Sequence, residues 1–273
     1  MNAPFRIDAA DGVAEVTIDH PPTNVFDRAF TVGLAGVLEA CEADATLRVM
    51  LFHSADPDFF CMHGDVPSLI GMQVPPGTAV TGANAAAALL ERVHRSRLVS
   101  VAAIDGAARG GGAEFATALD LRIGGPRTVF GQPEAAMGIL PGAGGTARLP
   151  HVLGRSRALD VILTCRDVGA EEALAIGWLD RLVASDQVLA EARRVARRIA
   201  AMPAPSIAAV KRVVDASLAD PEGALGTESA ELYGLLATGS HRAPMGRFLA
   251  AGGQTREGER DGFERLVVAM LGP

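Results

Sequence analysis

The stretch SVAAIDGAARGGGAEFATALDLRIGGPRTVFGQPEAAMGILPGAGGTAR, residues 100–148, decides the fold of this chain. An apolar run that enters it, Val99 to Ile104, predicts a buried strand. Three consecutive glycines at positions 110–112 follow, and a helical pattern starts at Glu114. The stretch therefore predicts strands that alternate with helices, joined by Gly-rich turns.

Two glutamates of this stretch follow Gly-rich turns. Glu114 opens the first helix, and Pro133 is a favourable first residue for a second helix, which would place Glu134 in its first turn. Glycine lets the backbone approach a ligand and leaves N–H groups free to donate, so N–H groups could hold an oxyanion while the carboxylates move protons or position water. A structural role is also open, because a glutamate in a first helical turn complements the helix dipole. The spacing of twenty positions does not show that the two side chains meet.

Three motifs then follow one another: GAARGGGAE, FGQPEAAMGILPGAGGTARLP and GAEEALAIGWLDRLV. Their order and spacing resemble those of the crotonase superfamily, also called the enoyl-CoA hydratase/isomerase family. The similarity covers most of the chain and is strong from about Val99 to Val183. It implies an α/β fold, a crotonase-like spiral of repeated ββα units with a C-terminal α-helical trimerisation region.

The resemblance also implies site residues. Glu114 and Glu134 would be catalytic, and the N–H groups of Gly64 and Gly111 would form the oxyanion hole. Residues expected to bind substrate are Met62, His63, Asp65, Gly142 and Arg28.

Three of these positions depart from the family or have an alternative role. Met62 and His63 replace the small residues that are usual before the oxyanion donor, so the pocket beside the thioester is expected to be narrower or more polar. Arg28 is a candidate for the coenzyme A phosphates, although a solvated helix arginine is the alternative.

Composition limits the classes of protein. The chain has 273 residues, 49% of them hydrophobic, and a net charge of −7, which fits one substantial core and argues against a nucleic-acid binder. No apolar run is long enough to predict a membrane span, and no secretion signal is visible. Cys41, Cys61 and Cys165 are odd in number and far apart, as expected for the cytoplasm. No spacing of ligands predicts a metal, and no cofactor is expected, because coenzyme A is part of the substrate.

The C-terminal part of the chain differs from the rest. Pro203 and Pro205 mark the expected boundary between an α/β core, residues 1–202, and a helical oligomerisation region, residues 203–273. Only helical patterns appear beyond this boundary. The resemblance implies that this region mediates contacts in a homotrimer, or in a hexamer built from two trimers.

The function implied by the resemblance is hydration of 2-enoyl-CoA to 3-hydroxyacyl-CoA, by a lyase of fatty-acid β-oxidation or related acyl-CoA metabolism. The presence of both acidic positions favours a hydratase, because many isomerases of the family keep only the second. We expect Glu134 to protonate C2 and Glu114 to position and activate the water.

Alternative functions stay open. One is isomerisation of a 3-enoyl-CoA, with Glu134 shuttling the proton, or other crotonase-type chemistry. Another is a non-catalytic acyl-CoA-binding protein. The tail favours this last reading, because Phe248 is followed by Leu-Ala-Ala-Gly-Gly, whereas relatives often have a basic run there.

Overall fold

The computed structural model describes residues 3–202, 204–217, 221–239, 241–260 and 262–271. The strands are β1 (Phe5–Ala10), β2 (Val13–Ile18), β3 (Val25–Phe26), β4 (Val49–Ser54), β5 (Phe59–Gly64), β6 (Val99–Ile104), β7 (Ala107–Arg109), β8 (Leu121–Gly124), β9 (Val129–Gly131), β10 (Val168–Gly169) and β11 (Arg181–Leu182). The helices of the first 202 residues are α1 (Arg28–Ala43), α2 (Val66–Gly71), α3 (Ala85–His94), α4 (Gly111–Ala118), α5 (Gly145–Leu153), α6 (Arg155–Thr164), α7 (Ala170–Ile176), the short 3-10 helix η1 (Ser185–Gln187) and α8 (Val188–Ala200). The later helices are α9 (Ala204–Ser217), α10 (Pro221–Thr238), α11 (Arg242–Ala250), α12 (Arg256–Arg260) and α13 (Phe263–Leu271).

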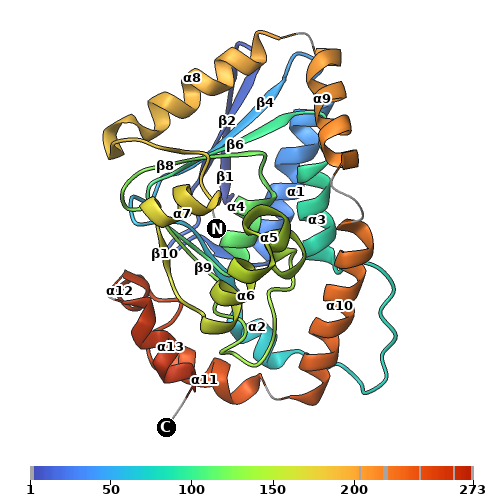
Figure 1. Cartoon of the computed structure of the whole chain (residues 1–273), viewed down its shortest axis with the longest axis vertical. Helices are drawn as coiled ribbons and strands as arrows, with labels where there is room; N and C mark the ends of the chain where they lie inside the picture. Colours follow the sequence, from blue (N-terminus) through green and yellow to red (C-terminus); the bar gives the residue numbers. More distant parts are fainter. Residues whose placement is uncertain (1–2, 203, 218–220, 240, 261, 272–273) are drawn as a thin grey trace.

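Two sheets organise the chain (Figure 1). The larger sheet has the order β1-β2-β4-β6-β8-β11, in which only the β1–β2 hairpin is antiparallel. The smaller sheet has the order β10-β9-β7-β5-β3 and is parallel except for β10 against β9. Successive strand pairs, such as β4 with β5 and β6 with β7, place one strand in each sheet before the chain turns into a helix. The predicted α/β fold of repeated strand–strand–helix units with C-terminal helices is confirmed.

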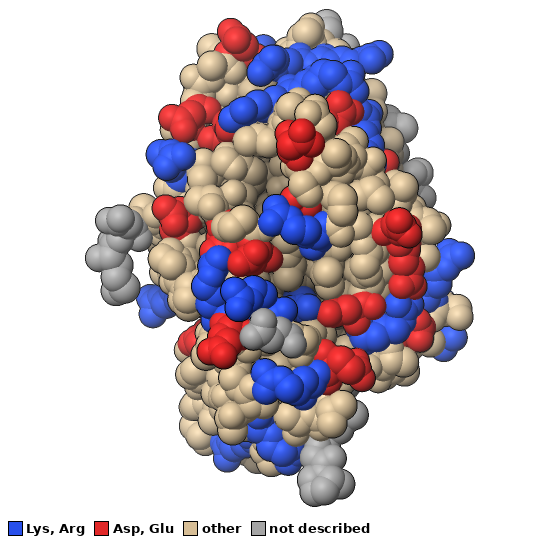
Figure 2. All heavy atoms as spheres, turned by 90° about the vertical axis from the view of Figure 1, so that its left-hand side faces the viewer, with Lys and Arg blue, Asp and Glu red and all other residues tan. Residues whose placement is uncertain are grey.

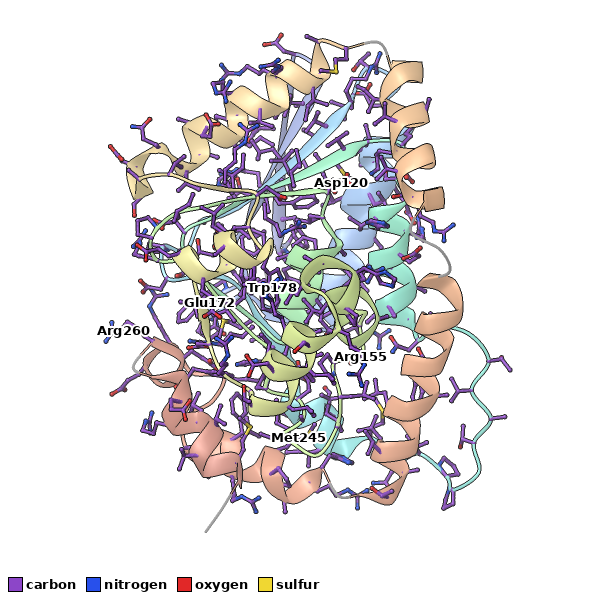
Figure 3. All side chains as sticks on the ribbon, in the orientation of Figure 1. Asp120, Arg155, Glu172, Trp178, Met245 and Arg260 are labelled. Carbon is purple, nitrogen blue, oxygen red and sulfur yellow. The ribbon has the colours of Figure 1, made fainter. Side chains whose placement is uncertain are left out.

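Both faces of the larger sheet are covered. Figure 1 shows α8 on one side of it and α1 and α3 on the other. The main core lies on the side of α1, α3 and α4, and Trp178 is buried there, stacked on Phe130 with ring centroids 4.8 Å apart. The Nε1 of Trp178 donates to Thr117 Oγ1 at 2.9 Å, so its polar edge is satisfied in the interior (Figure 3). This packing fixes α4, which carries part of the site described below.

Local sequence signals explain where α1 begins. The Asp27 side chain accepts a hydrogen bond from the Phe30 N–H at 2.8 Å, as an N-cap residue does. Phe30, Leu34 and Leu38 then repeat at helical spacing and are buried on one face. The cap and the apolar repeat are local properties of the sequence, and together they predict a helix over residues 28–43, which the structure confirms.

Two stretches with a helical pattern, residues 149–163 and 256–271, each predict a single helix from the sequence, but each is divided in the structure. The first stretch is divided because Gly154, with φ +79°, ends α5 and lets the chain turn into α6. The second is divided into α12 and α13. In both stretches a glycine with positive φ, Gly154 or Gly262, separates two helices whose apolar patterns are continuous in sequence.

The C-terminal helices pack against the rest of the chain. Residues of α11 and α13, among them Met245, Phe248 and Phe263, form a second apolar cluster with residues of α2 (Figure 3 labels Met245). The Nζ of Lys211, on α9, lies 2.7 Å from a carboxylate oxygen of Asp120, the residue directly before β8. Pro203, at the predicted boundary of the helical region, lies outside the described residues.

Charged groups are mixed over the face shown in Figure 2, and basic side chains gather at its upper end. The arginines of α8 lie at this end of the molecule. Two of them are paired, Arg193 with Glu15 and Arg194 with Glu191. Among the described ranges, no helix has the length and apolar character needed to cross a membrane.

Candidate active site

A cavity of about 490 Å³ lies between the start of α1, the end of β5, the start of α4 and α10. Its apolar lining residues are Phe26, Leu69, Met72, Ala85, Ala86, Ile139, Leu140, Ala143, Leu232, Tyr233 and Leu236. Its other lining residues are Asp27, Arg28, Thr31, Gly64, Asp65, Ser68, Asn84, Gly111, Glu114, Glu134 and Gly142. An apolar cavity with a few convergent polar groups is the usual form of a small-molecule site.

The glycine triplet lets α4 begin against β5. Gly110 precedes the helix with φ +53°, a conformation that costs other residues energy. A Cβ on Gly112 would lie 1.8 Å from the carbonyl oxygen of Cys61, so the helix and the strand meet backbone to backbone. Gly111, the first residue of α4, and Gly64, the last residue of β5, therefore line the cavity together. The first N–H groups of a helix have no partner within it, so the Gly111 N–H is available to a ligand.

Glu114 lies in the first turn of α4 and is only 4% exposed. Its Oε1 accepts two backbone hydrogen bonds, from Ala143 N at 2.7 Å and from Gly145 N at 2.8 Å. Burial raises the pKa of Glu114 from 4.5 to about 7, although these two N–H groups and Arg148 act in the opposite direction. Glu114 is thus poised to exchange a proton near neutral pH.

Glu134 reaches the same cavity from another element. The helix predicted from Pro133 is wrong: a single turn forms, in which Met137 N and Ile139 N donate to the carbonyl oxygen of Glu134. Gly138, with φ +83°, ends the turn before a helix can continue. The glutamate is 8% exposed, and the two carboxylates twenty positions apart in sequence line one cavity.

Three of the five residues predicted to bind substrate line the cavity: Arg28, Asp65 and Gly142. Arg28 is exposed at the start of α1. The carbonyl oxygen of Gly142 accepts a hydrogen bond from Asn84 Nδ2 at 2.6 Å, which ties the turn after Pro141 to the start of α3.

The other two, Met62 and His63, do not line the cavity, so their contact with substrate stays a prediction. Met62 is fully buried with Phe59 and Ala107. His63 is 2% exposed and points toward the C-terminal helices, where its Nε2 lies 3.1 Å from the carboxylate of Glu259. The direction of the His63 side chain depends on packing against C-terminal helices that lie far away in the sequence.

The wall of the cavity that α10 contributes could not be predicted from the sequence. Leu232, Tyr233 and Leu236 line the cavity, and a Cβ on Gly142 would meet the Leu232 side chain, so α10 lies directly on the turn that carries Gly142. The Asn84 side chain caps α3, because its Oδ1 accepts a hydrogen bond from Ala87 N at 3.0 Å. Its contact with Gly142, 58 positions away, has no local signal in the sequence.

The chain is similar in sequence to known proteins. The family model described as enoyl-CoA hydratase/isomerase matches residues 8–249. A curated Arabidopsis thaliana protein, "Probable enoyl-CoA hydratase 2, mitochondrial", is 34% identical over 212 residues, which are 77% of this chain and 70% of that protein.

Solved structures are similar as well. A crystal structure of a putative enoyl-CoA hydratase from Streptomyces avermitilis has a TM-score of 0.87 and 34% identity, and the match covers 99% of each chain. The crystal structure of an enoyl-CoA hydratase from Mycobacterium tuberculosis H37Rv has a TM-score of 0.72 and 27% identity, covering 85% of this chain and 98% of that one.

Proposed function

Because the chain belongs to the enoyl-CoA hydratase/isomerase family, we propose that it hydrates 2-enoyl-CoA thioesters to 3-hydroxyacyl-CoA. The observation that carries the proposal is that Glu114 and Glu134 both line one largely apolar cavity. Addition of water needs one group to take a proton from the water and one to give a proton to carbon, and two carboxylates supply both.

We assign the water to Glu114. Its Oε1 already accepts two backbone hydrogen bonds, so the second carboxylate oxygen is the atom left for the water. The ionised carboxylate accepts a proton as the oxygen of the water forms its bond to C3. Glu134 gives its proton to C2, so that OH and H from one water are added in total. Glu114 then holds the proton from the water and Glu134 is ionised; the pair returns to its starting state when Glu114 releases this proton to solvent and Glu134 takes one up. A pKa of Glu114 of about 7 leaves both protonation states accessible at neutral pH.

The thioester oxygen gains negative charge as C3 is attacked. We assign Gly64 and Gly111, which line the cavity at the end of β5 and the start of α4, as the N–H donors for this oxygen. Removal of one such donor costs about 3 kcal/mol of transition-state stabilisation in enzymes where it was measured. Coenzyme A enters as part of the substrate, so the proposal needs no separate cofactor.

Assembly into a trimer, or a hexamer of two trimers, through the helical region is part of this proposal. It is supported by large apolar side chains that are exposed on the single chain: Val210 on α9 is 63% exposed and Val32 on α1 is 64% exposed. Such side chains are commonly covered when subunits associate.

The test is to mix the purified protein with 2-butenoyl-CoA and with 3-butenoyl-CoA. We expect loss of the enoyl-thioester ultraviolet absorbance with the first substrate, and a product heavier by one water molecule. Conversion of 3-butenoyl-CoA with no addition of water to either substrate would show an isomerase instead. Binding of both thioesters without turnover would show a non-catalytic acyl-CoA-binding protein.

A further inference from the structure

A short C-terminal segment, residues 254–259, crosses the end of β5, and we name it the strap. Gln254, which begins it, has φ +62° and donates from its Nε2 to the carbonyl oxygen of Gly64 at 2.7 Å. Its backbone N–H donates to Glu259 Oε1 at 2.8 Å, which closes the strap on itself. Arg256 pairs with Asp56 and Asp58 at the surface. Figure 3 labels Arg260, the last residue of α12, at the edge of the molecule; it directly follows the strap.

The strap also holds His63, the residue before Gly64. The His63 ring lies between Phe248 and Phe263, perpendicular to the first at 5.1 Å and nearly parallel to the second at 5.8 Å between ring centroids. Its Nε2 lies 3.1 Å from the carboxylate of Glu259, and both side chains are almost fully buried. The imidazole therefore has one orientation, set by the strap and by α13.

Arg109 completes the network behind the strap. Its guanidinium makes a bidentate pair with Asp167, at 2.9 and 2.7 Å, and donates to the carbonyl oxygen of Glu259 at 3.2 Å. Burial raises the pKa of the Glu259 carboxyl, but His63, the Gln254 N–H and Arg109 together hold it below its usual value. A buried network of charged groups usually contributes little to net stability. This network lies beside Gly64 at the end of β5, where it can hold that residue in place.

The strap thus holds the groups on either side of the Gly64 N–H. The Gly64 N–H belongs to the peptide that joins His63 to Gly64; the His63 side chain is held on one side of it, and the Gly64 carbonyl on the other. His63 also lies close to Glu134, with Gly110 between them. A Cβ placed on Gly110 would lie 3.1 Å from His63 Nδ1 and 2.6 Å from Glu134 Oε1. The imidazole and the carboxylate therefore flank the same glycine, and His63 Nδ1 has no hydrogen-bond partner among the described residues.

We propose that Gln254 and Glu259 are positioning residues, which orient the Gly64 N–H toward the thioester oxygen by holding the Gly64 carbonyl and the His63 ring. The inference rests on the proposed function, because it assigns a purpose to the strap only if Gly64 is an oxyanion donor. The physical reason is that such donors act at 2.7–3.1 Å from the developing oxyanion and need a support that fixes their direction. Gln254 lies 190 positions from Gly64 in sequence, and Glu259 lies 196 positions from His63.

The experiment uses 4-(dimethylamino)cinnamoyl-CoA, a conjugated thioester that absorbs at longer wavelength when its carbonyl oxygen is polarised. Wild type should bind it with a red shift. Gln254→Ala and Glu259→Gln should bind it with affinity changed by less than about threefold, with a smaller red shift. For hydration, kcat should fall roughly 10- to 100-fold with KM nearly constant, less than for complete loss of a donor. Gln254→Glu has the same size but cannot donate when ionised, so it should behave like Gln254→Ala.

The control is Arg256→Ala, which removes the strap's surface ion pairs and leaves the contacts with Gly64 and His63. It should keep the red shift and kcat, since exposed ion pairs contribute about 0–1 kcal/mol. Thermal melting shows that each variant is folded. A full red shift in folded Gln254→Ala and Glu259→Gln would overturn the proposal, and so would an equal loss in Arg256→Ala. Absence of a red shift in wild type would refute the oxyanion hole itself, and the strap's role with it.

Discussion

Replacement of Glu114 by glutamine should make the protein more stable at high pH. Burial raises the pKa of Glu114 from 4.5 to about 7, so the folded state favours the protonated carboxyl. The stabilisation linked to this proton is fully present below pH 4.5 and is lost as the pH rises through about 7. The pKa difference corresponds to about 3 kcal/mol at high pH. Glutamine keeps an oxygen for the N–H groups of Ala143 and Gly145 and carries no charge at any pH.

The assay is urea unfolding of wild type and Glu114→Gln at about pH 5 and about pH 9, with the free energy of unfolding extrapolated to water. The two proteins should be nearly equal at the lower pH, and the variant should be more stable by up to about 3 kcal/mol at the higher pH. Glu171→Gln is the control, because Glu171 is an exposed residue in the first turn of α7. It should lose a few tenths of a kcal/mol, the opposite sign, since a charge there complements the helix dipole. The reasoning is refuted if Glu114→Gln is not the more stable protein at high pH.

Two further predictions concern the packing of α4. Gly112→Ala should destabilise the protein by roughly 3 kcal/mol or more, because its Cβ would lie 1.8 Å from the carbonyl oxygen of Cys61; Gly36→Ala, in the open on α1, should instead stabilise by about 0.5–1 kcal/mol. Similar melting temperatures for these two variants would contradict the close approach of α4 to β5. Thr117→Val should cost about 1–3 kcal/mol in urea unfolding, because it leaves the buried Trp178 Nε1 without its acceptor; a cost near zero would show that this bond is not needed.

The elements that the sequence predicts well are those with local causes. The bounds of α1 follow from a capping side chain, Asp27, and an apolar repeat within sixteen residues. The buried strand Val99–Ile104 follows from one uninterrupted apolar run. The helix predicted after Pro133 failed because Gly138 ends the turn, and a glycine five residues after a good helix start is compatible with either outcome.

Candidate residues of the site could be named from the sequence, but the residues that hold them in place and close the cavity could not. Glu114 and Glu134 could be named from the motifs, yet only the fold shows that they line the same cavity. The direction of His63 could not be predicted, because it is set by Glu259, 196 positions away. The same holds for α10. Its side chains close the cavity, but the helix contains none of the three sequence motifs that resemble the family.

The central claim is that two carboxylates share one addition of water, and the most direct test is the rate of hydration of 2-butenoyl-CoA by wild type, Glu114→Gln and Glu134→Gln. Both glutamines are similar in size to the residues that they replace, so we expect KM to change little and folding to be kept. Each variant should lose on the order of 10²- to 10⁴-fold in kcat, as expected for removal of a group that transfers a proton in the transition state. Hydration by either folded variant at close to the wild-type rate would contradict the account.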